Sequence, residues 1–333
     1  MNKKPTLGVL LGDACGVGPE LVAGLCAKDK LYPYCNPIII GDARVFEVAQ
    51  EVVKAELDVK IIDKVEDAEF SPGVYNLLDQ KDLDPKEINV GEVCKRAGKA
   101  SGDMLITALD LSKEGKLDGF VFAPLNKAAM KAGGYELESE NKLFGQYFGV
   151  ESTCEVNILD NLWTSRVTSH VPIKDVHDAL TQDSILRAIH ILNDSLKLGG
   201  VANPRLGIAA LNPHGGEDGT CGREEIDVIK PAMEEATKEG ISVQGPYPAD
   251  ILFIKAFNGD FDGAVTMYHD QGQIALKLKG FQYGVTAHVN LPVGIATAAH
   301  GSAFDIAGKA IATTDALENA VKVAAEMSAN LKK

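Results

Sequence analysis

The amino-acid sequence predicts an α/β fold in which helices alternate with the strands of a mainly parallel sheet. Short apolar runs rich in valine and isoleucine recur along the chain, and longer amphipathic stretches separate them. No tandem repeat, low-complexity tract or linker rich in proline and serine breaks this alternation. Any domain boundary therefore lies in an ordinary loop, where composition does not locate it.

The expected strands are the short runs with high β-propensity. They cover residues 7–11, 37–40, 59–62, 119–123, 155–159, 165–168, 206–211 and 263–267. The expected helices are the stretches with helical periodicity, and the first begins at Pro19, a residue suited to the first helical position. They cover residues 19–27, 92–111, 184–196, 224–238 and 316–330.

Length and charge narrow the class of protein. A chain of 333 residues has room for about two domains. Its net charge of −14 argues against nucleic acid as a partner, because proteins that follow phosphates carry clustered lysine and arginine. No run approaches the ~20 apolar residues that a membrane helix needs, so we expect no membrane partner. We expect a cytoplasmic protein. The six cysteines form no C-x-x-C pair, which predicts reduced thiols.

Three histidines, His170, His214 and His269, each stand shortly after an expected strand. Ligands of open α/β sheets bind outside the carboxyl ends of the strands, so these imidazoles could converge there. Three neutral imidazoles suit zinc and other first-row divalent ions, with open positions for a substrate. A histidine at a strand end is also commonly a hydrogen-bonded loop residue, and these residues alone leave both interpretations open.

Carboxylates and lysines accompany the histidines. Asp270 adjoins His269, Asp250 follows a Pro-Tyr-Pro-Ala stretch, and Lys277 comes seven residues after Asp270. An ammonium group beside a metal ion loses its proton more readily, so Lys277 is the first expectation for proton exchange. Lys127, after another expected strand, is the second. A solvated surface position is the alternative for either lysine.

Two glycine-bearing stretches point toward a ligand. In residues 300–309, His-Gly-Ser-Ala-Phe-Asp-Ile-Ala-Gly-Lys, small side chains let backbone approach a ligand, and Asp305 could accept hydrogen bonds from a ribose diol. The alternative is a turn in which Asp305 caps a short helix. Residues 12–20 have glycines at 12, 16 and 18, which lack the G-x-G-x-x-G spacing, so they predict a strand-to-helix turn instead of a dinucleotide loop.

Four motifs together are similar to one known family. They are Asn-Pro-His-Gly-Gly-Glu at residues 212–217, Tyr-His-Asp-Gln-Gly at 268–272, the glycine stretch 12–20 and Pro-Leu-Asn-Lys at 124–127. The chain resembles the 4-hydroxythreonine-4-phosphate dehydrogenase (PdxA) family nearly from end to end. Residues 300–309 separately resemble the nucleotide-binding stretch of isopropylmalate dehydrogenases.

The resemblance implies a two-domain α/β fold of the isocitrate and isopropylmalate dehydrogenase type, with an interdomain cleft. It implies a discontinuous first domain, residues 1–135 plus 300–333, that contributes to NAD binding. The second α/β domain, residues 136–299, would carry the metal histidines and the dimer contacts. We therefore expect a homodimer whose active sites use residues of both chains.

The resemblance also implies the chemistry. Family members oxidise a secondary hydroxyl with NAD, and the resulting β-keto acid loses carbon dioxide. A divalent metal, zinc or else magnesium, manganese, cobalt or nickel, is implied on the three histidines. Asp250, Asp270 and Lys277 match substrate-site positions, with Lys277 as proton donor. The implied NAD-binding residues are His300, Gly301, Ser302, Ala303 and Asp305.

The chain departs from the family where a phosphate would bind. Family members that act on phosphorylated substrates carry Gly-His-Thr-Glu where residues 138–141 read Glu-Ser-Glu-Asn, so Glu140 would repel a phosphate. Family members also carry an asparagine and an arginine at the positions occupied here by Thr286 and Ile295. Arginine is the usual bidentate partner of phosphate. The expected substrate-binding residues are Ser139, Glu140, Lys127 and Thr286.

These departures widen the choice of substrate. A non-phosphorylated hydroxy acid fits them, as does a carboxylated diol of the kind used by the terephthalate dihydrodiol dehydrogenase branch of the family. An acyltransferase related to phosphate acetyltransferase is an alternative that coenzyme A binding without NAD binding would favour. A metal-bound sensor that has lost catalysis is a third.

Overall fold

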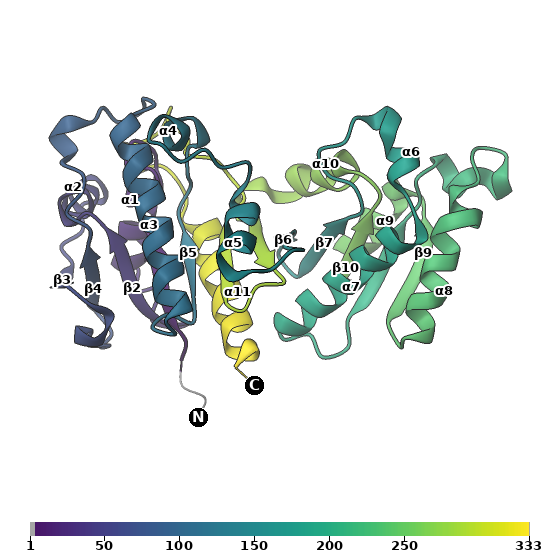
Figure 1. The fold of residues 1–333 in the computed structure, drawn as a ribbon, viewed down its shortest axis with the longest axis horizontal. Coiled ribbons are helices and arrows are strands. Elements are labelled where there is room, and N and C mark those ends of the chain that lie inside the picture. The colour runs from purple at the N-terminus through teal and green to yellow at the C-terminus, as the bar shows by residue number, and fades with distance from the viewer. Residues whose placement is uncertain (1–3, 333) are drawn as a thin grey trace. The chain divides into compact units, whose positions relative to one another are not determined.

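The computed structural model describes residues 4–332, which form two compact units (Figure 1). Unit 1 comprises the chain up to Thr153 and again from Val285, and unit 2 runs from Cys154 to Gly284. Within the described part of the chain, no helix combines the length and apolarity needed to cross a bilayer.

Unit 1 is built on a sheet in the order β3-β4-β2-β1-β5-β12-β11. Neighbouring strands are parallel except β11 and β12, which are antiparallel. Strands β1 and β2 are apolar on both faces, as expected for a parallel sheet covered by helices. The strands are β1 (Thr6–Leu10), β2 (Asn36–Gly41), β3 (Asp58–Ile62), β4 (Val74–Asp79), β5 (Gly119–Phe122), β11 (Val285–Val289) and β12 (Gly294–Ala298).

Three helices of unit 1 begin after a residue whose side chain satisfies a free amide group of the first turn. The side chains of Asp42, Asn126 and Ser139 accept hydrogen bonds from the first turns of α2, α4 and α5. Helix α3 packs on β1, β2 and β5, and α11 packs on β5, β11 and β12 (Figure 1). The helices are α1 (Gly18–Ala27), α2 (Ala43–Val53), α3 (Lys95–Lys113), α4 (Lys127–Ala132), α5 (Glu140–Phe148) and α11 (Asp315–Leu331).

Unit 2 has a smaller sheet in the order β6-β7-β10-β8-β9. Strands β7, β10, β8 and β9 are parallel neighbours, and β6 pairs with β7 in the antiparallel direction. These strands are β6 (Cys154–Leu159), β7 (Leu162–Arg166), β8 (Arg205–Ala209), β9 (Ser242–Tyr247) and β10 (Gly263–Thr266). The helices are α6 (Val176–Ala179), α7 (Gln182–Leu198), α8 (Lys230–Lys238), α9 (Ala249–Phe257) and α10 (His269–Gly280), and a π-helical turn, Glu225–Ile229, precedes α8.

The predicted α/β class is confirmed, and each of the eight expected strands overlaps an observed one. The sequence pattern missed β4, β9, β11 and β12. Strand β9 reads Ser-Val-Gln-Gly-Pro-Tyr, and its glycine and proline weaken the strand signal although an edge strand tolerates them. The expected helix 224–238 is the π-helical turn followed by α8.

The units divide at 153/154 and 284/285, whereas the family resemblance implied boundaries at 135/136 and 299/300. Two contacts explain the difference. Tyr147 of α5 hydrogen-bonds Asp110 of α3, and β12 pairs with β5 in register. Residues 136–153 and 285–299 therefore complete the sheet and helices of unit 1.

Candidate functional site

The three histidines lie at one edge of the unit 2 sheet. His170 follows β7, His269 follows β10 and His214 follows β8, and these strands are parallel neighbours in the order β7-β10-β8. Parallel strands present their carboxyl ends at the same edge. Asp250 follows β9, the next strand along, so the fold places four expected site positions at this edge.

The segments that carry His170 and His269 are joined beyond their strands. The backbone N–H and the hydroxyl of Thr168 both donate to the carbonyl of Met267, at 3.2 and 2.8 Å. The two imidazole rings lie 5.9 Å apart between centroids, inclined at 40°. The structure therefore brings this pair together as the sequence predicted.

Residues of the His-Asp-Gln-Gly motif connect the His269 segment to its surroundings. The Nδ1 atom of His269 lies 2.7 Å from Oδ1 of Asp270. The Gln271 side chain accepts from the N–H of Met267 at 2.8 Å and donates to the carbonyl of Ala210 at 2.7 Å. Gln271 thus ties the segment after β10 to the segment that leads to His214.

His214 lies in a turn of unusual backbone conformation. Residues 214–218 all have positive φ, between 44° and 81°, and His214, Glu217 and Asp218 are not glycines. For a residue with a β-carbon this left-handed region costs roughly 1 kcal/mol. Nδ1 of His214 lies 2.7 Å from Oε1 of Glu217 within the turn. The His214 side chain is 77% exposed and is not part of the His170–His269 contact.

Sequence reasoning missed the groups that hold this turn. The carboxylate of Glu225 is buried and accepts hydrogen bonds from the backbone N–H groups of Leu211 and Asn212, both at 2.8 Å. The side-chain amide of Asn212 donates to Glu224 and to Glu225. The only sequence signal was two adjacent glutamates at the start of an expected helix.

The donor chemistry fits a first-row divalent metal. Carboxylates beside Nδ1 of His214 and of His269 leave the Nε2 atoms as the ligand atoms, an arrangement typical of metal-binding histidines. Within residues 4–332, the side chains do not converge into a group of three or more His, Cys, Asp or Glu able to hold an ion. The fold thus supplies the three imidazoles at neighbouring strand ends.

The remaining expected residues of unit 2, Asp250, Asp270 and Lys277, are exposed. Asp270 and Lys277 are seven residues apart in α10, which places them on one face of the helix. Asp250 lies in the first turn of α9, directly after β9. These positions put carboxylates and an ammonium group on the elements that begin where the parallel strands end.

A second set of expected residues lies at the carboxyl ends of β1, β5 and β12, which are parallel neighbours in unit 1. The loops that follow these strands are residues 12–17, 124–127 and 300–309. Asp13 donates its N–H to the carbonyl of Pro124 at 3.0 Å, and Val17 donates its N–H to the carbonyl of Ser302 at 2.9 Å. Three motifs far apart in the sequence therefore contact one another.

Close packing explains the glycine in the middle of the first loop. A β-carbon on Gly16 would lie 2.7 Å from the carbonyl oxygen of Ser302. In the 300–309 loop, Nδ1 of His300 lies 3.0 Å from the carbonyl of Gly301, and Asp305 is exposed. Residues 304–308 form turns, so the turn of that alternative is observed, but no short helix begins at Asp305.

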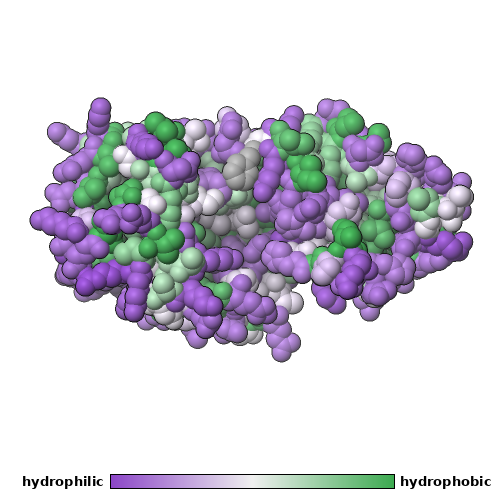
Figure 2. Space-filling model, turned by 90° about the horizontal axis from the view of Figure 1, so that it is seen from above, coloured by the Kyte–Doolittle hydropathy of each residue, from purple (hydrophilic) through white to green (hydrophobic). Residues whose placement is uncertain are grey.

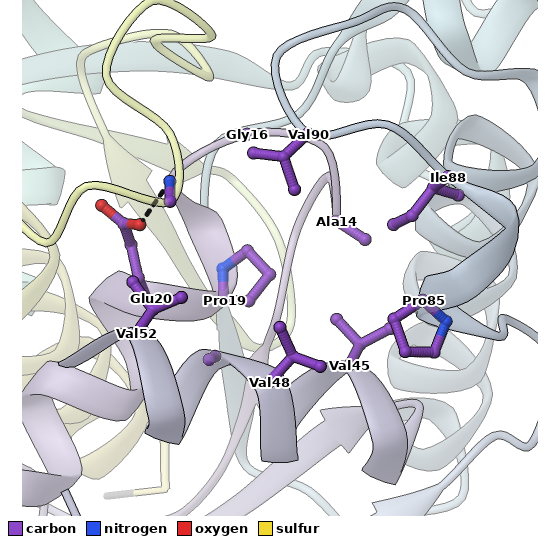
Figure 3. A pocket seen from close by; sticks show the side chains of 12 residues that line it. Ala14, Gly16, Pro19, Glu20, Val45, Val48, Val52, Pro85, Ile88 and Val90 are labelled. Atoms are coloured by element: carbon purple, nitrogen blue, oxygen red, sulfur yellow. Dashed lines mark hydrogen bonds between the residues drawn. The ribbon is translucent and has the colours of Figure 1, made fainter. Parts of the chain in front are cut away.

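Beside these loops lies a small apolar pocket, lined by Val45 and Val48 of α2, Pro19 of α1, and Ile88 and Val90 (Figure 3). At its edge the carboxylate of Glu20 accepts the N–H of Gly308 at 2.8 Å, which fixes the end of the 300–309 loop. None of the residues predicted to bind substrate, cofactor or metal lines this pocket.

Asp13 is a buried acid that the sequence did not single out. Its side chain is inaccessible to solvent, Oδ1 accepts the N–H of Cys15 at 2.8 Å, and Oδ2 has no hydrogen-bond partner. Burial raises the pKa of Asp13 to about 6, because the interior disfavours the charged carboxylate. The carboxylate form of Asp13 is therefore energetically unfavourable in this loop.

The expected substrate residues of unit 1 surround an ion pair. Nζ of Lys127 lies 3.2 Å from Oε2 of Glu140, and Ser139 caps α5 by accepting the N–H of Lys142 at 3.2 Å. The next residue of α5, Asn141, places Oδ1 2.6 Å from Nδ1 of His288. The structure thus brings Lys127, Ser139 and Glu140 together.

His288, which had no context in the sequence, lies beneath this ion pair. It is buried against the rings of Phe122 and Phe144, and burial lowers its pKa to about 4. It shares a face of β11 with Thr286, two residues away, and pairs in register with Ile295 of β12, which is fully buried. Ile295 therefore places an apolar, uncharged side chain beside His288.

Comparison with known proteins agrees with this arrangement. A family profile described as "Pyridoxal phosphate biosynthetic protein PdxA" matches residues 33–324. A Pseudomonas aeruginosa protein provisionally named 4-hydroxythreonine-4-phosphate dehydrogenase 2 is 41% identical over 327 residues, which is 97% of each chain. D-threonate 4-phosphate dehydrogenase of Cupriavidus necator is 36% identical over 325 residues, again 97% of each chain.

Solved structures give the same result. A 4-hydroxythreonine-4-phosphate dehydrogenase from Burkholderia phymatum superposes with a TM-score of 0.82 at 34% identity, covering 98% of this chain and 99% of the other. A terephthalate 1,2-cis-dihydrodiol dehydrogenase from Burkholderia xenovorans has a TM-score of 0.66 at 28% identity, covering 96% and 98%. The protein is thus an oxidoreductase that acts on CH–OH groups. It belongs to the PdxA family.

Proposed function

We propose that this protein is an NAD-dependent and divalent-metal-dependent dehydrogenase that oxidises a secondary hydroxyl of a hydroxy acid, with loss of carbon dioxide from the β-keto product. The observation that carries the proposal is the placement of His170, His269 and His214 after three neighbouring parallel strands. The family's dehydrogenases in general suggest a nicotinamide cofactor and a divalent metal.

The three histidines would hold the metal through their Nε2 atoms. When bound, such an ion stabilises negative charge on oxygen during both oxidation and decarboxylation. The carboxylates of Asp270 and Glu217 would keep Nδ1 of His269 and His214 protonated and the rings oriented. In this assignment the two carboxylates do not bind the metal and instead orient the histidines that do.

Lys277 of α10 and Asp250 of α9 would donate a proton to the substrate and accept a hydrogen bond from it, respectively. Nζ of Lys277, in the last turn of α10, would deliver a proton to the carbon that loses carbon dioxide. Asp250, at the start of α9, would accept a hydrogen bond from a substrate hydroxyl.

The loop after β12 would bind NAD. The exposed carboxylate of Asp305 would accept hydrogen bonds from the two ribose hydroxyls and would repel a 2′-phosphate, which favours NAD over NADP. Backbone groups would contact NAD closely at four further residues, His300, Gly301, Ser302 and Ala303. The contacts of Gly16 with Ser302 and of Glu20 with Gly308 support a fixed shape for this loop.

The charges around α5 support a substrate without a phosphate. Lys127 already pairs with Glu140, so this cation is neutralised by a carboxylate that would face the substrate. Ile295 is fully buried beside the neutral His288 and offers no positive charge. Ser139 and Thr286 would instead hydrogen-bond hydroxyl or carboxyl groups of a free acid.

A dihydrodiol carboxylate is a second candidate substrate, because position 295 carries no arginine to pair with a phosphate. Activity on a carboxylated diol but not on an open-chain hydroxy acid would select it. An acyltransferase would instead bind coenzyme A and ignore NAD. The 300–309 loop, with its exposed Asp305, argues against that alternative.

We also propose a homodimer with shared active sites. Hydrophobic side chains are exposed on two helices of unit 2, Ile251 and Ile254 on α9 and Ile274 and Leu278 on α10. Figure 2 shows hydrophobic patches on an otherwise mainly hydrophilic surface. Light scattering of the purified chain tests this part of the proposal, because a monomer at micromolar concentration would contradict it.

The reaction is tested by following reduced nicotinamide. The metal-stripped protein is incubated with NAD, one added divalent ion and a panel of four-carbon hydroxy acids, their 4-phosphates and carboxylated diols. We expect metal-dependent reduction of NAD with a free acid or diol. Reduction with the phosphorylated acids alone would contradict the substrate assignment, and silence across the panel would contradict the reaction.

A further inference from the structure

The hydrogen bonds that Glu225 accepts come from the segment leading into the His214 turn. Its Oε1 accepts the N–H groups of Leu211 and Asn212, and its Oε2 accepts the Asn212 side-chain amide at 3.0 Å. Glu225 is 1% exposed. Burying a carboxylate is costly unless hydrogen bonds compensate, so this group and the segment fix each other.

The segment needs such support because the turn after it is strained. Residues 214–218 follow a left-handed path that includes three residues with β-carbons. Strain of this kind persists only where the surrounding structure holds it, and it is common at functional sites. A β-carbon on Gly216 would lie 2.6 Å from Oε2 of Glu225, so the carboxylate packs against the middle of the turn as well.

The position of Glu225 in its own element is also unusual. It begins the π-helical turn Glu225–Ile229, a rare form that recurs at functional sites, and Ile229 at the end of the turn is fully buried. The preceding Glu224 lies 2.6 Å from Nδ2 of Asn212 and 2.7 Å from Nδ1 of His177. His177 is on α6, so this pair of glutamates connects the segment after His170 to the turn that bears His214.

We infer that Glu225 is a positioning residue that holds the left-handed turn so that His214 can serve as the third ligand of the metal. The inference rests on the proposed metal site. Glu225 touches neither ion nor substrate, and it acts through the backbone of Leu211 and Asn212. Its loss therefore weakens metal binding without removing a ligand.

The test compares Glu225→Gln with Asp227→Asn in the full-length protein. In Glu225→Gln, the new side-chain NH₂ group faces the NH₂ group of Asn212. Both groups are hydrogen-bond donors, so the bond between these two side chains is lost. Asp227 lies in the same π-helical turn, but its carboxylate pairs with Arg223, which makes it the matched control. Both variants and the wild type are stripped of metal and titrated with Co²⁺ alone, using the visible absorption of the bound ion.

We expect Glu225→Gln to weaken Co²⁺ binding by about 10-fold to 100-fold, the range for lost supporting groups, and Asp227→Asn to bind like the wild type. In metal-free protein, amide hydrogen exchange at Leu211 and Asn212 should be faster in Glu225→Gln. Equal Co²⁺ affinity in Glu225→Gln and wild type would overturn the inference.

A second variant keeps the test informative if Glu225→Gln does not fold. Asn212→Ala removes the amide that bridges Glu224 and Glu225 from a half-buried position, and we expect a several-fold loss of Co²⁺ affinity. Unchanged affinity in that variant would count against the inference. A wild type that binds no Co²⁺ would instead overturn the proposed metal site itself, which separates the two failures.

Discussion

The imidazole rings of His170 and His269 lie 5.9 Å apart although 98 residues separate them in the sequence, because β7 and β10 are parallel neighbours that end at the same edge. We predict that a divalent ion binds there and stabilises the fold. A ligand at 100 times its Kd adds about 2.7 kcal/mol to the free energy of unfolding.

Thermal unfolding with and without a chelator measures this effect. We expect the melting temperature to fall by several degrees on chelation in the wild type. His190→Gln, which alters a surface histidine that pairs with Glu239, should show the same fall. His269→Asn should melt at one temperature with or without chelator, and a chelator-sensitive His269→Asn would contradict the assignment.

The buried acid Asp13 predicts a stabilising substitution. Because its pKa is about 6 in the folded state and 3.8 in model compounds, the folded state holds its proton more tightly. The stability that this proton provides is present at low pH and is lost as pH rises through about 6. Asp13→Asn should therefore be more stable than the wild type at pH 7, by up to about 2 to 3 kcal/mol.

Urea unfolding at pH 7 and pH 4 tests this prediction. The difference between Asp13→Asn and the wild type should shrink at pH 4, where the wild-type carboxyl is protonated in the fold. An equal difference at both pH values would show that the substitution acts through packing.

His288 predicts a pH dependence of the opposite sign. Burial lowers its pKa to about 4 from 6.5, so the unfolded chain binds the extra proton between these values. The wild type should lose stability as pH falls from 6.5 toward 4, by up to about 3 kcal/mol from this group. His288→Gln should lose less over that interval in urea unfolding. Parallel losses in both proteins would contradict a buried neutral imidazole.

The contact between Gly16 and Ser302 predicts a selective loss of NAD binding. A methyl group at Gly16 would push on the Ser302 backbone, so Gly16→Ala should weaken NAD binding at least several-fold as measured by calorimetry. Gly301→Ala meets no atom within 4 Å, so its melting temperature should match the wild type. If Gly16→Ala binds NAD normally while remaining folded, the 300–309 loop is not the NAD site.

Glu140 predicts discrimination against phosphate. Replacing its carboxylate in Glu140→Gln removes one negative charge beside Lys127, so kcat/KM for a phosphorylated acid should rise severalfold relative to the free acid. Glu136→Gln, which breaks an exposed pair with Lys131, is the control and should leave the ratio unchanged. If Glu140→Gln leaves the ratio of kcat/KM for the phosphorylated and free acids unchanged, the substrate does not bind beside Glu140.

Much of this arrangement could be predicted from sequence, because functional side chains of α/β proteins commonly lie in the loops that follow the carboxyl ends of strands. His170, His214 and His269 were found by their distance from apolar runs, which fixes the sheet edge they occupy. Glu225 and His288 could not be found in this way. Their roles depend on hydrogen bonds to residues 13 and 147 positions away, which no local pattern encodes.

The left-handed turn at His214 also escaped prediction. Two glycines at 215 and 216 indicate a turn, but they do not encode the positive φ of His214 and Glu217. We infer that Glu225 holds this conformation through its hydrogen bonds to Leu211 and Asn212. Strand β9 was missed for a related reason, since its pairing with β8 compensates for a glycine and a proline.

Metal titration of the three single histidine variants tests the central claim most directly. Metal-free wild type, His170→Asn, His214→Asn and His269→Asn are each titrated with Zn²⁺ by calorimetry. We predict one tight site per chain in the wild type and a loss of affinity of at least about 100-fold in each variant, because each loses a ligand. If His214→Asn binds Zn²⁺ as tightly as the wild type, the three histidines do not share an ion.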